Sequence, residues 1–323
     1  MKTIFITGSS GFIGYSLSLF LLMKGFSVIG LDNHNNYYDK NLKILRNKKL
    51  KKFRNFKFIH NDLSNTNYIF KKVINTKIEF LIHLAARPGV SGSISNPHSY
   101  LTNITDNFYI YDLVKLLKVK KLIYASSSSI YSVSNKKRFS ENDKITKFNN
   151  FYGLTKYTNE IFDDYFSSLL NIKSVGLRFF SVYGPFGRPD MAYYSFVDSI
   201  LKNKTINVFN YGKNKRDFTY IDDVIDGIYS LIIKFDKISN LKSTYNIGNQ
   251  SPRSIFDMVK IIEKTLNLKA KISFKKKNYG DVEYTSANTM LAKKDFNFQS
   301  KVSLEEGMEK FISWYLNNIK EKF

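Results

Sequence analysis

A glycine-rich turn near the N-terminus places the strongest constraint on the fold. Gly8, Gly11 and Gly14 lie between a short apolar segment, Thr3–Ile6, and a segment with helical periodicity, Phe12–Lys24. Glycines at this spacing let a strand turn tightly into a helix, whose first N–H groups are then open to a phosphate. The segment therefore predicts a strand, a phosphate-binding turn and a helix, which together begin a dinucleotide-binding sheet.

An acidic residue follows the second apolar segment, some twenty residues further on. A carboxylate at this position accepts a hydrogen bond from the adenosine ribose 2′-hydroxyl and repels a 2′-phosphate, which favours NAD over NADP. The predicted NAD contacts in this part of the chain are Gly8, Gly11, Phe12, Ile13, Gly14, Asp32 and Asn33. Asp62 and Leu63, after the third apolar segment, are expected to contact the adenine, although an isolated Asp62 is equally an ordinary turn residue.

Short apolar segments alternate with helical periodicity through the first half of the chain, which is typical of a parallel sheet with crossover helices. Strands are expected at Thr3–Ile6, Ser27–Leu31, Phe56–Ile59, Phe80–Leu84, Lys121–Ala125 and Ser174–Arg178. Helices are expected at Phe12–Lys24, Tyr100–Leu117, Tyr152–Leu170, Ser254–Leu266 and Leu304–Asn317. We predict an α/β fold: a doubly wound parallel sheet (Rossmann) over residues 1–180 and a smaller C-terminal α/β substrate lobe over 181–323. Residues near 217–235 are expected to return to the first domain.

Composition narrows the class of protein further. The chain has 323 residues and no cysteine, so it can form a full core but no disulfide, zinc–thiolate site or cysteine nucleophile. The first residues show no secretion signal, and the apolar stretch from Phe12 to Met23 is too short to span a bilayer. We expect a cytoplasmic protein with no membrane partner.

The net charge of +23 is large enough to attract polyanions. However, no zinc-finger, RNP or helix-turn-helix pattern accompanies it, so no nucleic-acid partner is predicted. The densest basic run, Lys40 to Lys57, contains no acidic residue and is expected to be a solvated helix and loop. The four histidines lack the spacing of metal ligands and are expected to be structural, so no metal site is predicted.

Tyr152 and Lys156 are four positions apart, which places them on one face of a predicted helix. The same spacing recurs at other Tyr/Lys pairs of this chain, so spacing alone is not specific. The position of Tyr152 is more informative, because its helix follows the fifth strand, whose end carries the serines 126–129. In an open α/β sheet that end of the strands faces the ligand crevice.

These residue types suit a hydride-transfer site. A tyrosine is a poor base near its ordinary pKa of about 10, but a lysine ammonium and a nicotinamide ring favour the phenolate. Tyr152 can then remove a proton from a substrate hydroxyl, Ser127 can pass that proton on or hold the substrate oxygen, and Lys156 can bind the nicotinamide ribose. The serines are alternatively a hydroxyl-rich turn that caps the next element.

With these motifs the chain resembles the extended short-chain dehydrogenase/reductase superfamily, and within it the NAD-dependent epimerase/dehydratase family, most closely the UDP-glucuronate 4-epimerases. The likeness covers nearly the whole chain and is most specific at Leu177–Ala192 and Tyr211–Asp223. It implies an NAD-dependent isomerase whose C-terminal lobe binds a UDP-sugar. It also implies a homodimer that forms through the helices at 100–117 and 152–170.

The resemblance also implies roles for individual residues. Ser127, Tyr152 and Lys156 match the catalytic set, and Ala85, Ala86 and Asn103 match contacts on the nicotinamide side. The matched substrate contacts are Arg216 for the diphosphate, Asp281 for the uridine ribose, and Arg188 as a second substrate-side arginine. An arginine fork suits a diphosphate well, but considered alone, either arginine is more simply explained by a surface salt bridge.

Four serines, Ser127, Ser128, Ser129 and Ser181, resemble the carboxylate cradle of the epimerases. Related dehydratases carry an Asp-Glu pair after the catalytic Thr, and related decarboxylases usually carry a Glu there. The chain is therefore expected to convert UDP-glucuronate into UDP-galacturonate through a 4-keto intermediate. The alternatives are a UDP-glucose or UDP-N-acetylglucosamine 4-epimerase, and a non-catalytic protein that binds NAD or a sugar nucleotide.

The chain departs from the epimerase pattern at a few positions. Arg87-Pro88 stands where the epimerases often have Gln-Ala, and Ser91-Gly92 stands where they often have an Arg-Tyr pair. One expected basic contact is therefore missing at Ser91. Ser132 replaces a glycine, and Asn288 replaces a frequent Asp. These departures bear on sugar specificity more than on the fold.

Overall fold

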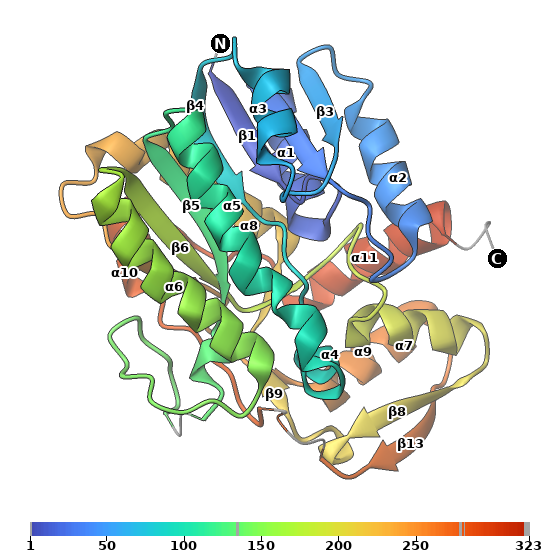
Figure 1. Cartoon of the computed structure of the whole chain (residues 1–323). Helices are drawn as coiled ribbons and strands as arrows, with labels where there is room; N and C mark the ends of the chain where they lie inside the picture. The colour runs from blue at the N-terminus through green and yellow to red at the C-terminus, as the bar shows by residue number, and fades with distance from the viewer. Residues whose placement is uncertain (1, 134–135, 278–279, 281, 320–323) are drawn as a thin grey trace.

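The computed structural model describes residues 2–133, 136–277, 280 and 282–319 (Figure 1). Its centre is a seven-stranded sheet in the order β11-β6-β5-β4-β1-β2-β3, in which every neighbouring pair is parallel. The strands are β1 (Thr3–Thr7), β2 (Ser27–Asp32), β3 (Phe56–His60), β4 (Ile78–His83), β5 (Lys121–Ser127), β6 (Lys173–Phe179) and β11 (Thr244–Ile247). Apolar side chains on both faces of the strands require a cover of helices on each face.

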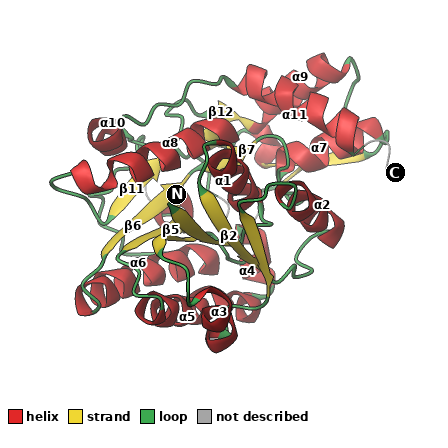
Figure 2. Ribbon diagram, turned by 90° about the horizontal axis from the view of Figure 1, so that it is seen from above, coloured by secondary structure: helices red, strands yellow, loops and turns green. Residues whose placement is uncertain are grey.

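Helices cover the two faces of the sheet (Figure 2). One face carries α1 (Phe12–Met23), α2 (Lys40–Leu50) and α8 (Ile221–Lys234), and the other carries α3 (Thr66–Val73), α5 (Thr102–Leu116) and α6 (Phe151–Leu169). Each face has its own hydrophobic core: Leu17 and Leu21 of α1 belong to one cluster, and Leu113 and Val114 of α5 to the other. The predicted doubly wound sheet is confirmed.

The C-terminal residues form a smaller α/β region against the first face. Its main elements are α7 (Ala192–Leu201), α9 (Ile255–Leu266), α10 (Met290–Phe296), α11 (Leu304–Asn318) and the parallel pair β8 (Thr205–Phe209) and β13 (Lys271–Lys275). Two small pairings join them, β7 (Ser181–Tyr183) with β10 (Phe218–Tyr220) and β9 (Lys215–Arg216) with β12 (Arg253–Ser254). The remaining short helices are α4 (Val90–Ser95), η1 (Pro97–Tyr100), η2 (Ser128–Tyr131), η3 (Asn210–Gly212) and η4 (Phe235–Lys237).

The chain crosses between the two regions more than once. After β10 it forms α8, which packs against α1, and later β11 joins the edge of the main sheet beside β6. One hydrophobic cluster contains side chains of α1 together with side chains of α9 and α11. The domain boundary near residue 181 stays a prediction.

One expectation about the surface is wrong. The basic run from Lys40 to Lys57 does contain a helix, α2, but that helix is not solvated on all sides. Arg46 is fully buried, and its guanidinium donates to the carbonyl oxygens of Ser10, Phe186 and Gly187 at 2.9, 2.5 and 3.1 Å. Arg46 thus ties the glycine-rich turn to the loop after β7, which a count of charges cannot reveal.

Candidate active site

A cavity of about 580 Å³ opens at the carboxyl ends of the central strands. The chain order of the strands reverses between β1 and β4, and ligands of open α/β sheets bind at such a switch point. Most residues singled out from the sequence line this one cavity: Gly8, Gly11, Phe12, Ile13, Gly14, Asp32, Asn33, Asp62, Leu63, Ala85, Ala86, Ser127, Ser128, Ser129, Tyr152, Lys156, Ser181, Arg188 and Arg216. Asn103 does not line it, and Asp281 lies outside the described residues.

The glycine-rich turn is too tight for side chains. Gly8 has a φ of +69°, and a Cβ on Gly14 would lie 2.1 Å from the carbonyl oxygen of Gly8. No side chain caps the first turn of α1, which begins at Phe12. The free N–H groups and the positive end of the helix dipole therefore face the cavity, as an anionic diphosphate requires.

The acidic residues after β2 and β3 lie at the same end of the cavity. Asp32 accepts hydrogen bonds from the backbone N–H groups of Ser10 (3.1 Å) and His34 (2.8 Å). Asp62 accepts from the Asn33 amide at 2.7 Å and from the backbone N–H of Ser64 at 3.1 Å. Burial acts to raise the pKa of Asp62, but these hydrogen bonds outweigh it and lower the pKa. Asp62 is therefore a turn residue that also borders the cavity.

The Ser/Tyr/Lys set comes from two neighbouring elements. Ser127 ends β5, while Tyr152 and Lys156 lie in the first turns of α6, whose N-terminus is capped by Asn150. The two elements are in close contact, because a Cβ on Gly153 would lie 2.4 Å from the carbonyl oxygen of Ser129. The glycine between the tyrosine and the lysine therefore lets α6 approach the serine turn.

Ser127 serves the turn as well as the cavity. Its side-chain oxygen accepts a hydrogen bond from the backbone N–H of Ser129 at 3.1 Å, which caps η2. The hydroxyl also acts on Tyr152, where it lowers the phenol pKa. The capping interpretation thus holds at Ser127, and the oxygen keeps its own proton to donate. The catalytic role of Ser127 stays a prediction.

Burial dominates the electrostatics of the set. It raises the pKa of Tyr152 above its ordinary value of 10.0, although Arg188 and Ser127 act in the opposite direction. It lowers the pKa of Lys156 to about 8, against the pull of Asp106, and the Lys156 ammonium donates to the carbonyl oxygen of Ala125 at 3.0 Å. In this state Tyr152 is a neutral phenol, so an additional positive charge is needed to form the phenolate.

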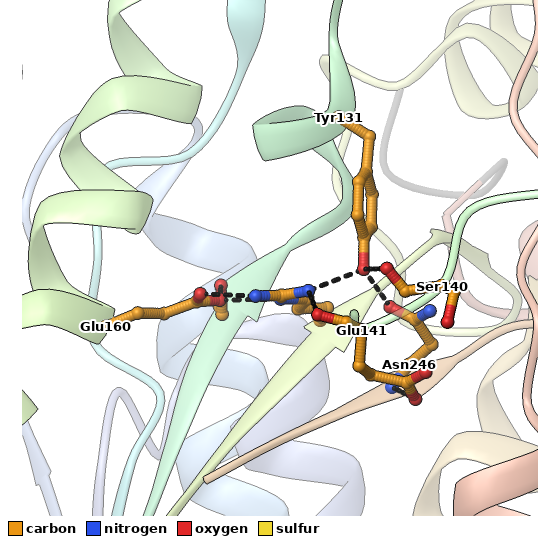
Figure 3. Close-up of polar contacts among 7 residues, drawn as sticks. Tyr131, Ser140, Glu141, Glu160 and Asn246 are labelled. Atoms are coloured by element: carbon orange, nitrogen blue, oxygen red, sulfur yellow. Dashed lines mark hydrogen bonds and ion pairs between the residues drawn. The ribbon is translucent and has the colours of Figure 1, made fainter. Parts of the chain in front are cut away.

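A buried polar network supports α6 behind the cavity (Figure 3). Glu160, one turn beyond Lys156, accepts two hydrogen bonds from Arg178 of β6, at 2.9 and 2.7 Å, and one from Ser126 at 2.5 Å. Arg178 also donates to the hydroxyl of Tyr131 at 2.6 Å. The network links the end of β5, α6 and β6, so it fixes the helix that carries Tyr152 against the sheet.

The two arginines that resemble substrate contacts both border the cavity. Arg188 forms a bidentate pair with Asp190, with distances of 3.0 and 2.6 Å, and its side chain is 19% exposed. Burial acts to raise the pKa of Asp190, but Arg188 lowers it, so the pair is ionised. Arg188 therefore makes a salt bridge and still lines the cavity, while its contact with a substrate stays a prediction. Arg216 lies at the end formed by the C-terminal region, beside Thr285.

Asn103 lies just behind the cavity wall. Its side-chain oxygen accepts from the backbone N–H of Arg87 at 2.7 Å, and its amide donates to the carbonyl oxygen of Arg87 at 2.9 Å. Its contact with the cofactor stays a prediction. The sequence interpretation did not include Arg87, Tyr37 or Asp106 in the site, although all three line the cavity. Their neighbours come from distant parts of the chain, so no local pattern identifies them.

Two other kinds of feature are absent from the described part of the chain, a metal cluster and a membrane-spanning helix. In it, no group of three or more His, Cys, Asp or Glu side chains is arranged to hold a metal ion. Likewise, none of its helices combines the length and the apolar character needed to cross a bilayer.

Comparisons with known proteins agree with this geometry. A model of the NAD dependent epimerase/dehydratase family matches residues 4–248. An uncharacterised protein of Methanocaldococcus jannaschii is 41% identical over 321 residues, which cover 98% of this chain and 97% of that protein. UDP-glucuronate 4-epimerase 4 of Arabidopsis thaliana is 36% identical over 330 residues, which cover 98% of this chain and 75% of that protein. The structure of UDP-glucuronic acid 4-epimerase from Bacillus cereus with UDP-glucuronic acid and NAD has a TM-score of 0.88 at 30% identity, covering 98% and 99% of the two chains.

Proposed function

Because the chain belongs to the NAD-dependent epimerase/dehydratase family, we propose that it interconverts UDP-glucuronate and UDP-galacturonate by inverting C4 of the hexose. The observation that carries this proposal is the cavity in which Ser127, Tyr152 and Lys156 meet a wall of serine hydroxyls. NAD supplies a nicotinamide ring that accepts the C4″ hydride and later returns it to the other face of the sugar.

The residues of the turn fit NAD. Because Gly8 and Gly14 carry no side chains, the turn stays compact and a diphosphate can lie over the uncapped start of α1, where backbone N–H groups stabilise negative charge. Asp32 ends β2 and Asp62 follows β3, on one side of the switch point, where we place the adenosine. The predicted nicotinamide contacts Ala85 and Ala86 follow β4 on the other side, where Lys156 contacts Ala125 of β5. A carboxylate at Asp32 favours NAD over its 2′-phosphorylated form.

Tyr152 is the proposed proton acceptor for the C4″ hydroxyl. Its buried phenol becomes a phenolate more readily when positive charge lies close, and Arg188 acts on it in this direction. Lys156, one turn further along α6, is the proposed second source of positive charge once the cofactor is bound. Ser127 holds the same substrate oxygen and stabilises the phenolate through its hydroxyl. When C4″ is reduced again, the same phenol returns the proton, so the residues end each cycle in their starting state.

The serines that border the cavity support a uronate as the substrate. A 4-keto uronate is a β-keto acid, which loses carbon dioxide readily when its carboxylate is free to align with the carbonyl group. Ser128, Ser129 and Ser181 border the cavity and offer hydroxyls but no carboxylate that could act as an acid or base at C5 or C6. Hydroxyls that fix the carboxylate out of that alignment protect the intermediate, as correct positioning in an active site does generally.

The proposal is tested by incubating the NAD-loaded protein separately with UDP-glucuronate, UDP-glucose and UDP-N-acetylglucosamine, and by resolving the products by NMR. We expect UDP-galacturonate from the first tube, with little decarboxylated pentose product. Turnover of the neutral sugars alone would overturn the uronate assignment and leave a neutral-sugar 4-epimerase. No turnover in any tube would leave a protein that only binds its ligands.

We also propose that the protein is a homodimer. A stripe of large apolar side chains lies exposed on the outer surface of α6 and continues onto α5: Leu154, Ile161, Tyr165, Leu169 and Phe108. The spacing along α6 is that of one helix face. An exposed apolar patch of this kind favours association, and a two-fold axis allows the same two helices of a second copy to cover it.

A further inference from the structure

The loop after β4 carries an arginine whose positive charge has no acidic partner among the described residues. Arg87 lines the cavity, and its buried Nε has no hydrogen-bond partner. Within the described part of the chain its guanidinium makes no hydrogen bond or ion pair, and its neighbours are the ring faces of Tyr37 and Tyr100, at 5.2 and 5.6 Å. Burying unsatisfied donors is costly, so this arrangement calls for an anionic ligand.

The loop is held firmly in place. Asn103 binds both the N–H and the carbonyl oxygen of Arg87, at 2.7 and 2.9 Å. The hydroxyls of Tyr37 and Tyr100 both donate to the carbonyl oxygen of Pro88, each at 2.7 Å. Three side chains thus fix three successive peptide groups, from the N–H of Arg87 to the carbonyl group of Pro88. A guanidinium on such a loop is pre-organised, so little entropy is lost when it binds.

Arg87 lies at the reacting end of the cavity. The ring of Tyr100, beneath its guanidinium, is 6.2 Å from the ring of Tyr152. Arg188 also lies near Tyr37, 5.9 Å from that ring, and its charge acts on the Tyr152 phenol. Asp190 balances the charge of Arg188, whereas no carboxylate pairs with Arg87 within the described residues.

We propose that Arg87 is a specificity-determining residue that binds the carboxylate of the hexuronate and so selects UDP-uronates over neutral UDP-hexoses. The inference rests on the proposed function, since it assigns the substrate class of the same site. The carboxylate is the only anionic group on the hexose ring, and a planar guanidinium matches its two oxygens. A neutral hexose leaves the donors of Arg87 unpaired, which penalises its binding.

The test compares Arg87→Met, which keeps an unbranched apolar side chain and removes the guanidinium with its charge, with the wild type. Calorimetry on the NAD-loaded proteins gives the Kd of UDP-glucuronate and, separately, of UDP-glucose. We expect Arg87→Met to weaken UDP-glucuronate binding about 10- to 100-fold, as for the loss of a charge-assisted hydrogen bond. UDP-glucose should bind as tightly as to the wild type or more tightly, because the donors that it leaves unpaired are gone. Arg87→Lys should recover part of the difference, since it restores the charge without the planar fork.

Two controls separate this role from other causes. Arg54→Met removes one positive charge at an exposed site and should change neither Kd. The NAD content of each variant shows whether the cofactor site is intact. If Arg87→Met fails to fold, as judged by circular dichroism, the ratio of the two Kd values in Arg87→Lys decides the question.

Each remaining outcome overturns the proposal. An equal loss for both UDP-sugars would assign Arg87 to the shared nucleotide, and a loss of NAD would assign it to the cofactor. Unchanged binding of both sugars would show that Arg87 takes no part in recognition.

The proposed function is judged separately from the role of Arg87. If the wild type epimerises UDP-glucuronate but the Arg87 variant has the same ratio of the two Kd values, only the role of Arg87 is wrong. If the wild type binds the uronate but does not convert it, only the epimerase assignment is wrong.

Discussion

The phenol of Tyr152 is the group whose removal should damage turnover most. Tyr152→Phe keeps the ring and its packing but removes the proton acceptor. We expect kcat to fall about 10²- to 10⁴-fold, the usual range for a general base, with the Kd of the UDP-sugar close to that of the wild type. Tyr68→Phe, at an exposed position on α3 away from the cavity and the apolar stripe, is the matched control. A fall of less than tenfold in Tyr152→Phe would assign proton transfer to another group.

The buried ammonium of Lys156 lowers the stability of the folded protein. Burial lowers its pKa from 10.5 to about 8, so the charged form destabilises the folded protein. Between pH 8 and pH 10.5 the lysine is mostly protonated in the unfolded chain but mostly neutral in the folded protein. The loss of folding stability is therefore complete below pH 8 and disappears as the pH rises toward 10.5.

Lys156→Met should consequently gain stability and lose activity. At pH 7 we expect the cofactor-free variant to be more stable than the wild type by about 1–3 kcal/mol, an order-of-magnitude figure from the size of the pKa shift. The advantage should shrink by pH 10. Urea unfolding of both proteins at the two pH values measures it. An advantage that does not change with pH would show that the charge of Lys156 is not the cause.

Sequence patterns identify the residues of the site that belong to local motifs. The glycine-rich turn, Asp32 and the Tyr152/Lys156 pair are of this kind, and all line the cavity. Arg87 is different, because its significance depends on Tyr37, Asn103 and Tyr100, which approach it only in the folded chain. The exact contacts of the matched cofactor and substrate residues stay predictions.

At the level of elements, the periodic segments are the ones that sequence predicts well. The expected strands all form, and their ends move by no more than two residues. β11 was not predicted, because its four residues are too short to show a period. α2 was misjudged for a related reason: Leu42, Arg46 and Leu50 share one buried face, but the abundance of lysines hides it.

The ion pair between α6 and β6 makes a prediction at this scale. Replacing one partner leaves the other charge buried without compensation, so Glu160→Gln and Arg178→Met should each cost about 3–5 kcal/mol of stability. The double variant should be more stable than the sum of the single losses implies, since both charges are then absent. Urea denaturation of the wild type, the two single variants and the double variant gives the free energies of unfolding for this comparison. Additive losses would mean that the pair does not act as a unit.

At the level of the whole molecule, the apolar stripe on α6 predicts the assembly. Ile161→Glu combined with Leu169→Glu places charges on side chains that are 53% and 62% exposed in the single chain. We expect the wild type to sediment as a dimer and this variant as a monomer, because charges in the core of an interface are strongly unfavourable. Met290→Glu, at a position that is 72% exposed on α10, is the control. A wild type that is monomeric at micromolar concentration would contradict the proposal.

The most direct test of the whole account follows the hydride itself. UDP-glucuronate deuterated at C4″ is incubated with the NAD-loaded protein in ordinary water, and the product is examined by NMR and mass spectrometry. If NAD stores the hydride and returns it to the other face, UDP-galacturonate forms with its deuterium still at C4″, and no NADH accumulates. Loss of the deuterium to solvent, stoichiometric release of NADH, or a pentose as the main product would contradict that account.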